Sequence, residues 1–227
     1  MYRIGIVGYG NLGKACEKIA AASADFEVAG IFTRRDPASM TSPFGTPFFR
    51  QSELSSFEGK IDVLALCTGS ANDLVELGKS AAKHFNTVDS FDTHAKMRGY
   101  VADMERIASE SGHLSFIGIG WDPGLFSLMR ALFGGVLAAG DTQTFWGKGV
   151  SQGHSEAVRK IKGVVKGIQY TVPKEAALEA ARRGEGAALT TRDKHLRECF
   201  VVAAADADKA EIEREIVTMP NYFDEYD

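Results

Sequence analysis

Two aspartates, Asp92 and Asp122, stand in short polar segments that each follow a stretch with the composition of a β-strand. The carboxyl ends of parallel strands meet at one edge of a sheet, so both carboxylates are expected at the same edge. Two carboxylates facing one ligand suit an ammonium group better than another carboxylate. From spacing alone the structural alternatives are equally good, because Asp92 suits the cap of a following helix and Asp122 precedes Pro123 in a turn.

A glycine pattern near the N-terminus has the spacing of a dinucleotide-binding turn. Gly8, Gly10 and Gly13 form G-x-G-x-x-G between an apolar stretch and a helical one. Gly8 permits the tight turn, Gly10 lets a pyrophosphate approach the backbone, and Gly13 lets helix and strand pack closely. The phosphates would bind the N–H groups at the helix N-terminus. The alternative is an ordinary glycine-rich turn between strand and helix.

The end of the second predicted strand indicates which dinucleotide binds. An NAD site usually has Asp or Glu there, about 20 residues past the glycines, to bind the ribose hydroxyls. This chain has Thr33, Arg34 and Arg35 instead, and Asp36 lies beyond both arginines. Arginine pairs well with a 2′-phosphate, so NADP(H) is the predicted cofactor. The alternative is a solvated basic turn.

Two further segments have the composition of ligand-binding loops. Residues 67–72 are small and polar and follow a buried strand, where a dinucleotide cofactor lies in this type of fold. Residues 145–155 are rich in glycine, polar and aromatic residues, which suits a loop that wraps a small ligand, with a glycine-turned hairpin as the alternative. On charge alone, Arg182, Arg183 and the basic residues of 192–197 are interpreted as mostly solvated, with recruitment of one of them to a carboxylate as the alternative.

Cysteines and histidines give no sign of a metal site or a disulfide framework. Cys16, Cys67 and Cys199 are odd in number and widely spaced, and Cys67 is interpreted as a packed small apolar residue. The histidines lack the spacing of metal ligands and are expected at the surface or at caps; they include His94, His113, His154 and His195.

Strands and helices alternate through the first half of the chain. Strands are predicted at 2–7, 26–33, 61–67, 87–90 and 114–118, helices at 12–22, 71–85 and 94–111, and mostly loop at 36–51. This alternation predicts an α/β fold, a Rossmann-type doubly wound parallel sheet. In the second half, helices are predicted at 123–139, 175–183 and 206–217, and strands at 141–146, 168–172 and 198–203. The predicted domains are an NADP-binding Rossmann domain, 1–122, and an incomplete α+β substrate and dimerisation domain, 123–227.

Composition excludes several classes of protein. The 227 residues carry 26 basic and 30 acidic side chains, a formal net charge of −4, which does not favour nucleic acid or an anionic membrane as partner. No apolar run approaches the length of a membrane span, and the N-terminus lacks an export signal. With the scattered cysteines, these features lead us to expect a cytoplasmic protein.

Together these segments resemble the meso-diaminopimelate dehydrogenases, NADP-dependent enzymes of bacterial lysine and cell-wall precursor metabolism. The match runs nearly from end to end. It is carried by V-G-Y-G-N-L-G at 7–13, G-I-F-T-R-R at 30–35, C-T-G-S-A at 67–71, V-D-S-F-D-T-H at 88–94, G-W-D-P-G at 120–124, F-W-G-x-G-x-S-Q-G-H-S at 145–155, Q-Y-T-x-P at 169–173 and T-M-P-x-Y-F at 218–223. The last four strings are far more specific than the glycine turn.

The resemblance implies oxidation of the D-configured amino-acid carbon of meso-diaminopimelate, with hydride transfer to NADP⁺ and release of L-2-amino-6-oxopimelate and ammonia. It implies that Asp92 and Asp122 hold the reacting amino group. Its other substrate residues are Gln152 and Gly153 at the nearby carboxylate, Thr171 and Arg197 at the distal carboxylate, and Trp146 in the pocket wall. Its cofactor residues are Gly8, Tyr9, Gly10, Asn11, Leu12, Gly13, Thr33, Arg34, Arg35, Thr68, Gly69, Ser70, Ser90, Phe91, Pro123, Gly124, Leu125, Phe126 and Ser127.

The sequence departs from the family at its C-terminal end. Family members continue for roughly a hundred further residues, which carry a histidine and an asparagine that recognise the distal centre, and the family is dimeric. Two alternatives therefore stand beside the enzyme: an NADP(H)-binding module without turnover, and a related dehydrogenase of another D-amino acid.

Overall fold

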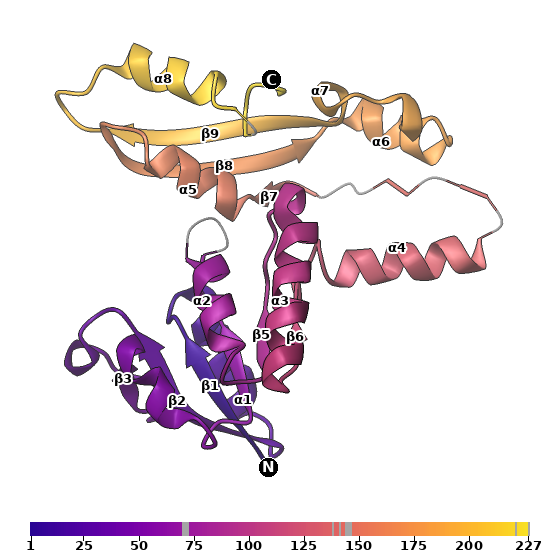
Figure 1. Ribbon diagram of the computed structural model, residues 1–227. Coiled ribbons are helices and arrows are strands. Elements are labelled where there is room, and N and C mark those ends of the chain that lie inside the picture. Colours follow the sequence, from indigo (N-terminus) through magenta and orange to yellow (C-terminus); the bar gives the residue numbers. More distant parts are fainter. Residues whose placement is uncertain (70–72, 138, 141, 144–146, 221, 227) are drawn as a thin grey trace. The chain divides into compact units, whose positions relative to one another are not determined.

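The computed structural model (Figure 1) describes residues 1–69, 73–137, 139–140, 142–143, 147–220 and 222–226. The chain forms two compact units, Met1–Phe133 and Gly134–Asp227. The domain boundary expected from the sequence lies between residues 122 and 123. It separates a cofactor-binding part from a substrate-binding part, which is a functional division, and it stays a prediction.

The first unit is built on a six-stranded parallel sheet with the order β3-β2-β1-β4-β5-β6. This is the strand order of a doubly wound dinucleotide-binding fold, and it confirms the predicted fold class. The elements in chain order are β1 (Tyr2–Val7), α1 (Asn11–Ala21), β2 (Phe26–Thr33), η1 (Pro37–Ser39), β3 (Phe48–Arg50), η2 (Gln51–Phe57), β4 (Val63–Leu66), α2 (Leu74–Ala81), β5 (Thr87–Asp89), η3 (His94–Lys96), α3 (Met97–Ser111), β6 (Ser115–Phe116) and α4 (Leu125–Val136).

Both faces of this sheet are covered, which is why the C-terminal halves of β1 and β4 are apolar and buried. Neighbouring residues of β1 point to opposite faces. Ile6 packs with Ile31 and with Cys16 of α1, whereas Val7 belongs to the larger core that includes Met104 and other residues of α2 and α3. The central strands therefore end at a rigid edge, from which the loops of the candidate site extend.

Several element boundaries differ from the sequence predictions. Within 36–51, expected to be mostly loop, Phe48–Arg50 forms the edge strand β3. The Phe49 ring stacks on Phe32, with 5.7 Å between centroids, and this packing offsets the weak local tendency to form a strand. The helix predicted at 94–111 begins with the 3₁₀ turn η3, and β6 comprises only two residues.

The second unit is an α+β arrangement on an antiparallel sheet with the order β7-β8-β9. It agrees with the α+β arrangement predicted for the second half of the chain. The elements are β7 (Gly149–Val150), α5 (Gln152–Arg159), β8 (Val164–Pro173), α6 (Glu175–Arg182), η4 (Gly186–Ala188), α7 (Thr191–Lys194), β9 (His195–Ala203) and α8 (Lys209–Val217). The strand predicted at 141–146 falls mostly outside the described residues.

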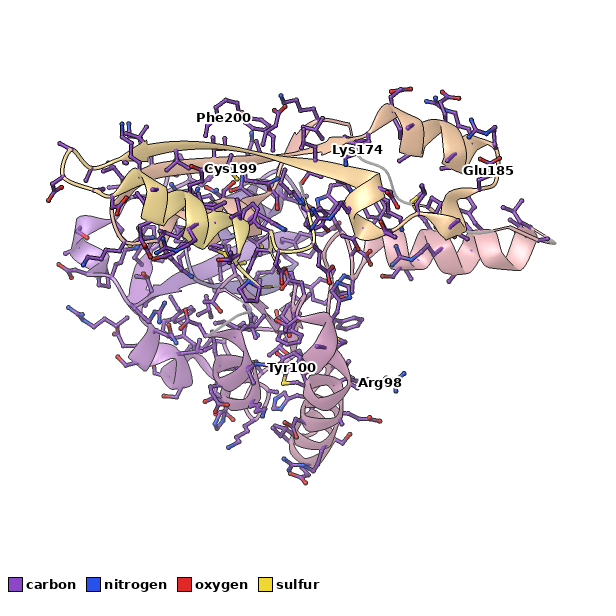
Figure 2. All side chains as sticks on the ribbon, turned by 90° about the horizontal axis from the view of Figure 1, so that it is seen from above. Arg98, Tyr100, Lys174, Glu185, Cys199 and Phe200 are labelled. Carbon is purple, nitrogen blue, oxygen red and sulfur yellow. The ribbon has the colours of Figure 1, made fainter. Side chains whose placement is uncertain are left out.

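Helix α5 packs against β8 at a glycine. A Cβ atom at Gly167 would lie 2.8 Å from Cγ1 of Val158, so a side chain there would push the helix away. The loop expected over 145–155 is wrong in its C-terminal part, because α5 begins at Gln152 and buries Ser155 and Val158. On β9, Cys199 and Phe200 are consecutive and so lie on opposite faces (Figure 2); Phe200 is 58% exposed.

Helix α4 carries many exposed apolar side chains, among them Leu128 and Leu132. Within the part of the chain that the structure describes, neither α4 nor any other helix combines the length and the apolar character that crossing a membrane requires.

Candidate active site

The glycine turn between β1 and α1 has the close packing that its spacing predicts. Gly8 has φ +91°, and a Cβ atom there would lie 2.7 Å from the Cys67 carbonyl oxygen. A Cβ atom at Gly13 would lie 2.1 Å from the Gly8 carbonyl oxygen. A Cβ atom at Gly10 would meet nothing within 4 Å. Gly8 and Gly13 are therefore required by packing, whereas Gly10 leaves the backbone accessible to a ligand.

Buried hydrogen bonds fix Tyr9, in the middle of this turn. Its hydroxyl donates to Glu17 Oε2 at 2.5 Å, and Glu17 is fully buried on α1. The same carboxylate accepts a hydrogen bond from Ser42 Oγ, in the loop that follows β2. Glu17 thus ties the turn to the loop beside it, a role that the sequence reasoning missed because an acidic residue on a helix ordinarily faces solvent.

The three residues predicted to recognise a 2′-phosphate lie at the end of β2, beside the glycine turn. Thr33 is buried, and its Oγ1 accepts from the Arg35 backbone N–H at 3.1 Å. Arg35 Nη2 donates to the Tyr9 carbonyl oxygen at 2.8 Å. Arg34 instead forms a two-point ion pair with Asp73, at 3.0 and 2.8 Å. Arg34 and Arg35 therefore both lie beside the glycine turn. Each of them already donates to an acceptor of this chain, the Asp73 carboxylate for Arg34 and the Tyr9 carbonyl oxygen for Arg35.

The loop after β4 contributes a hydroxyl without a partner. Oγ1 of Thr68 is buried and has no hydrogen-bond partner in the described residues. A buried donor left unpaired is costly, so a ligand that accepted from it would be favoured. Next to it, the Gly69 carbonyl oxygen accepts from the Asp73 and Leu74 N–H groups at 3.2 Å each. Ser70 lies outside the described residues.

Asp89 holds the loops after β5 and β6 together. Its buried carboxylate accepts from the N–H groups of Phe91 at 2.9 Å and Gly118 at 3.2 Å, and from the Tyr100 hydroxyl at 2.8 Å. The Asp89 carbonyl oxygen also accepts from the Ile119 N–H at 2.8 Å. The burial of Tyr100, with its proximity to this carboxylate, raises the pKa of the tyrosine hydroxyl. The segments that carry Asp92 and Asp122 are thus adjacent at the sheet edge.

Asp122 is held by the first turns of α4. Its carboxylate accepts from Arg130 at 2.5 and 3.0 Å and from Ser127 Oγ at 3.1 Å. The Arg130 hydrogen bonds lower the pKa of Asp122, which is therefore ionised at neutral pH. The turn itself is tight, since a Cβ atom at Gly124 would lie 1.9 Å from the Gly120 carbonyl oxygen. Asp122 therefore acts as a turn residue that bonds to the following helix, as its structural alternative predicts. Its carboxylate is only partly buried, so a ligand is still able to reach it.

Asp92 is exposed and does not cap a helix. The residues at the N-caps of η3 and α3 are Thr93 and Lys96, so the capping alternative for Asp92 is wrong. Its neighbour Phe91 is fully buried against Tyr100, with ring centroids 4.3 Å apart. Phe91 therefore contributes to the core, and its N–H is engaged by the Asp89 carboxylate.

In the second unit, Thr171 and Arg197 are paired across β8 and β9. Nη1 of Arg197 donates to Thr171 Oγ1, and the guanidinium lies 4.0 Å from the centre of the Tyr226 ring. Arg197 is half-buried. Gln169, on the same face of β8, is fully buried. Gln169 Oε1 and Arg197 Nε have no hydrogen-bond partner among the described residues, which leaves polar capacity for a ligand.

His154 is packed inside the second unit, so the expectation of a surface or capping histidine is wrong for this residue. Its ring makes edge contacts with Tyr222 and Phe223, at 5.2 and 5.5 Å between centroids, and its Nδ1 lies 2.7 Å from Ser151 Oγ. Burial, with the charge of Arg197, lowers the pKa of His154 to about 4. His154 is therefore neutral at physiological pH.

The remaining predicted substrate residues are placed less tightly. Gln152 and Gly153 are exposed in the first turn of α5, and Trp146 lies outside the described residues. A cavity of about 680 Å³ between β9 and α8 is lined in part by Arg197, but its walls are mostly apolar and include Val201, Ile212 and Ile216. Such walls do not suit a ligand with two carboxylates and two amino groups.

Two cysteines that are far apart in sequence meet beside the glycine turn. Cys16 and Cys67 pack against the same small core, and a hydrogen bond from Cys67 lowers the pKa of Cys16. The described residues contain no group of three or more histidine, cysteine or acidic side chains with the arrangement of a metal site.

Comparison with known proteins gives one family-model match and several relatives that match nearly the whole chain. The family model for the diaminopimelic acid dehydrogenase C-terminal domain matches residues 120–227. Meso-diaminopimelate D-dehydrogenase of Ureibacillus thermosphaericus is 52% identical over 225 residues, covering 99% of this chain and 69% of the relative.

Solved structures also resemble the whole chain. The C. glutamicum DAP dehydrogenase in complex with DAP has a TM-score of 0.91 and 45% identity, with 100% of this chain and 69% of that chain covered. An engineered D-amino acid dehydrogenase bound to NADP⁺ has a TM-score of 0.87 and 43% identity, with coverage of 100% and 69%. The similarity thus extends over both units.

Proposed function

The chain belongs to the meso-diaminopimelate dehydrogenase family, and on that premise we propose that it catalyses the NADP-dependent, reversible oxidative deamination of meso-2,6-diaminopimelate. The D-centre is oxidised, and the products are L-2-amino-6-oxopimelate and ammonia. The observation that carries this proposal is 52% identity to the relative from Ureibacillus thermosphaericus across 99% of the chain. The reaction belongs to lysine and diaminopimelate biosynthesis.

The cofactor of the proposed reaction is NADP(H), bound by residues 1–122. Support comes from the open backbone at Gly10, the unpaired Thr68 hydroxyl and the arginine pair that stands where an acid would bind NAD. The phosphates would meet the N–H groups at the start of α1, and the 2′-phosphate would meet Arg34 and Arg35. When bound, the nicotinamide supplies the acceptor for the hydride.

We assign the substrate's reacting amino group to Asp92 and Asp122. Support comes from the adjacency of the loops that carry them and from the ionised state of Asp122. An ammonium group would either share the Asp122 carboxylate with Arg130 or displace the Arg130 guanidinium from it. The amine must lose a proton before its α-hydrogen leaves as hydride, and holding the nitrogen between carboxylates orients it for that step.

The distal carboxylate of the substrate is assigned to Thr171 and Arg197 in residues 123–227, with Gln152, Gly153 and Trp146 at the rest of the pocket. Support comes from Arg197 Nε, a buried donor that has no hydrogen-bond partner among the described residues. Arg197 binds a carboxylate well, because its planar guanidinium offers paired donors. We further propose a homodimer in the cytoplasm, with no nucleic acid or membrane as partner.

The test is formation of NADPH by the purified protein with NADP⁺ and meso-diaminopimelate. Asp122→Asn should lower kcat strongly, because the neutral amide no longer attracts the ammonium group. Asp103→Asn is the matched control, since Asp103 is also ion-paired, 2.6 Å from Lys79 on the far side of α2 and α3, and should leave kcat unchanged. Equal activity in all three proteins would contradict the assigned role of Asp122.

A second candidate is dehydrogenation of another D-amino acid, which the similarity to an engineered D-amino acid dehydrogenase favours. It is distinguished in the same assay by comparing meso-diaminopimelate with simple D-amino acids. A larger kcat/KM for a simple D-amino acid would support this candidate. If the protein binds NADPH but turns over none of these substrates, the result would support the interpretation as an NADP(H)-binding module without catalytic activity.

A further inference from the structure

The end of β2 is joined to the loop after β4 by an ion pair that the predicted cofactor site does not explain. Nη1 and Nη2 of Arg34 donate to Oδ1 and Oδ2 of Asp73 at 3.0 and 2.8 Å, which is the parallel two-point geometry of the strongest arginine–carboxylate pairs. The two residues are 39 positions apart in the chain. Both terminal amino groups of the arginine that should bind a 2′-phosphate are thus engaged by a carboxylate.

We propose that Asp73 is a specificity-determining residue of the cofactor site, because its carboxylate competes with the 2′-phosphate of NADP(H) for Arg34. The inference rests on the proposed function and names a residue that the cofactor assignment leaves out. NAD(H) lacks the phosphate, so it binds with the Arg34–Asp73 pair intact. NADP(H) binds only as Arg34 exchanges one anion for another. Asp73 therefore weakens NADP(H) binding and leaves NAD(H) binding unchanged.

Charge repulsion makes it more favourable for the 2′-phosphate to replace the Asp73 carboxylate on Arg34 than for both anions to bind Arg34 together. A phosphate carries roughly −1.5 to −2 at neutral pH, and two anions on one guanidinium repel each other. The Arg34 side chain is 68% exposed and is able to move, whereas Arg35 is held by the Tyr9 carbonyl oxygen, which carries no net charge. Arg35 therefore stays available to the phosphate while Arg34 changes partner.

The size of the effect follows from the exposure of the pair. Exposed ion pairs contribute little because water screens them, so removing the competing carboxylate should strengthen NADPH binding by about threefold to fivefold. The gain should shrink at high salt, where the charges are screened further.

The experiment is a titration of the full chain with NADPH and with NADH, followed by ligand fluorescence at low and high salt. Four proteins are compared: the unaltered chain, Asp73→Asn, Arg34→Ala and the double variant. Asp103→Asn serves as the control for removal of an ion-paired carboxylate elsewhere in the same unit. Thermal unfolding of each variant verifies that the chain remains folded.

The expected result is tighter NADPH binding by Asp73→Asn, with unchanged NADH binding and no effect of Asp103→Asn. The gain should vanish in the Arg34→Ala background, because Asp73 acts through that arginine. Unchanged or weaker NADPH binding by Asp73→Asn, or a gain that survives without Arg34, would overturn the inference while leaving the proposed function standing. An unaltered chain that fails to bind NADPH would overturn both.

Discussion

The two units treat their charged ligand-binding candidates differently. At the sheet edge of the first unit, Arg34 is paired with Asp73 and Asp122 is paired with Arg130. In the second unit, the described residues around Arg197 leave a guanidinium nitrogen and the Gln169 oxygen buried without hydrogen bonds. A charged ligand at the first site therefore competes with internal ion pairs, and of the described residues there only the Thr68 hydroxyl is in reserve, whereas the second site has a buried guanidinium nitrogen and an amide oxygen in reserve.

This difference has an energetic meaning. Partner exchange costs little at exposed ion pairs, because water screens both the old and the new contact. Buried polar groups without partners cost folding free energy, which a ligand that hydrogen-bonds to them returns as affinity. We expect the first unit to be stable without ligand and the second to gain more from binding.

The largest expected effect is at the glycine turn of the first unit. Gly13→Ala should lower the free energy of unfolding by about 3 kcal/mol, because the new Cβ would lie 2.1 Å from the Gly8 carbonyl oxygen and the backbone must shift. Chemical denaturation measures the change. Gly10→Ala is the matched control, since no atom lies within 4 Å of the new Cβ; it should leave stability nearly unchanged and weaken NADPH binding. Equal stability of the two variants would contradict the packing described for Gly13.

The next effect is a pH dependence in the second unit. The pKa of His154 is lowered from its ordinary value of about 6.5 to about 4 in the folded chain. Below pH 6.5 the unfolded chain therefore binds more protons than the folded chain. Its contribution to stability is present above pH 6.5 and is lost as the pH falls toward 4. The loss should reach up to about 3 kcal/mol at pH 4.

The measurement is the free energy of unfolding between pH 7 and pH 4 for the unaltered chain and for His154→Gln. The difference between the two proteins should narrow as the pH falls, because the glutamine does not titrate. His84→Gln is the control, since His84 is exposed beside Glu58. An identical pH dependence with and without His154 would show that this histidine is not buried in its neutral form.

A smaller effect on NADPH binding is expected at Arg35, which pairs with a carbonyl oxygen and with no carboxylate of the described residues. Arg35→Ala should weaken NADPH binding by about 1.5 kcal/mol, roughly tenfold, by removing a charged hydrogen bond to the 2′-phosphate. NADH binding should change less, and ligand titration measures both. Arg98→Ala, at an exposed position on α3 (Figure 2), should change neither. A parallel loss of NADPH and NADH affinity would assign Arg35 to the turn rather than to the phosphate.

The smallest effect tests the reserve of polar groups in the second unit. Gln169→Leu should raise the free energy of unfolding by about 1 kcal/mol, because it removes a buried oxygen without a partner. The same change should raise KM for meso-diaminopimelate. A loss of stability with an unchanged KM would show that the Gln169 amide contributes to folding alone, and the contrast between the two units would then disappear.

Much of the cofactor half was predictable because its signals are local. The glycine spacing, the apolar strands and the arginines at the end of β2 all act within a few residues of where they stand, and the fold class follows from the alternation of elements. The short strand β3 was missed because the ring packing that stabilises it joins segments that are separate in the sequence.

By itself the sequence determined the parallel sheet, the dinucleotide turn and the residue types offered to a ligand, since these depend on backbone conformation and on periodicity. Only the tertiary structure decided which partners those residues take. Asp73 reaches Arg34 across 39 residues, Asp89 joins two loops, and Tyr222 and Phe223 bury His154. Charge pairing and burial depend on contacts between distant segments, so they follow from the folded arrangement rather than from spacing along the chain.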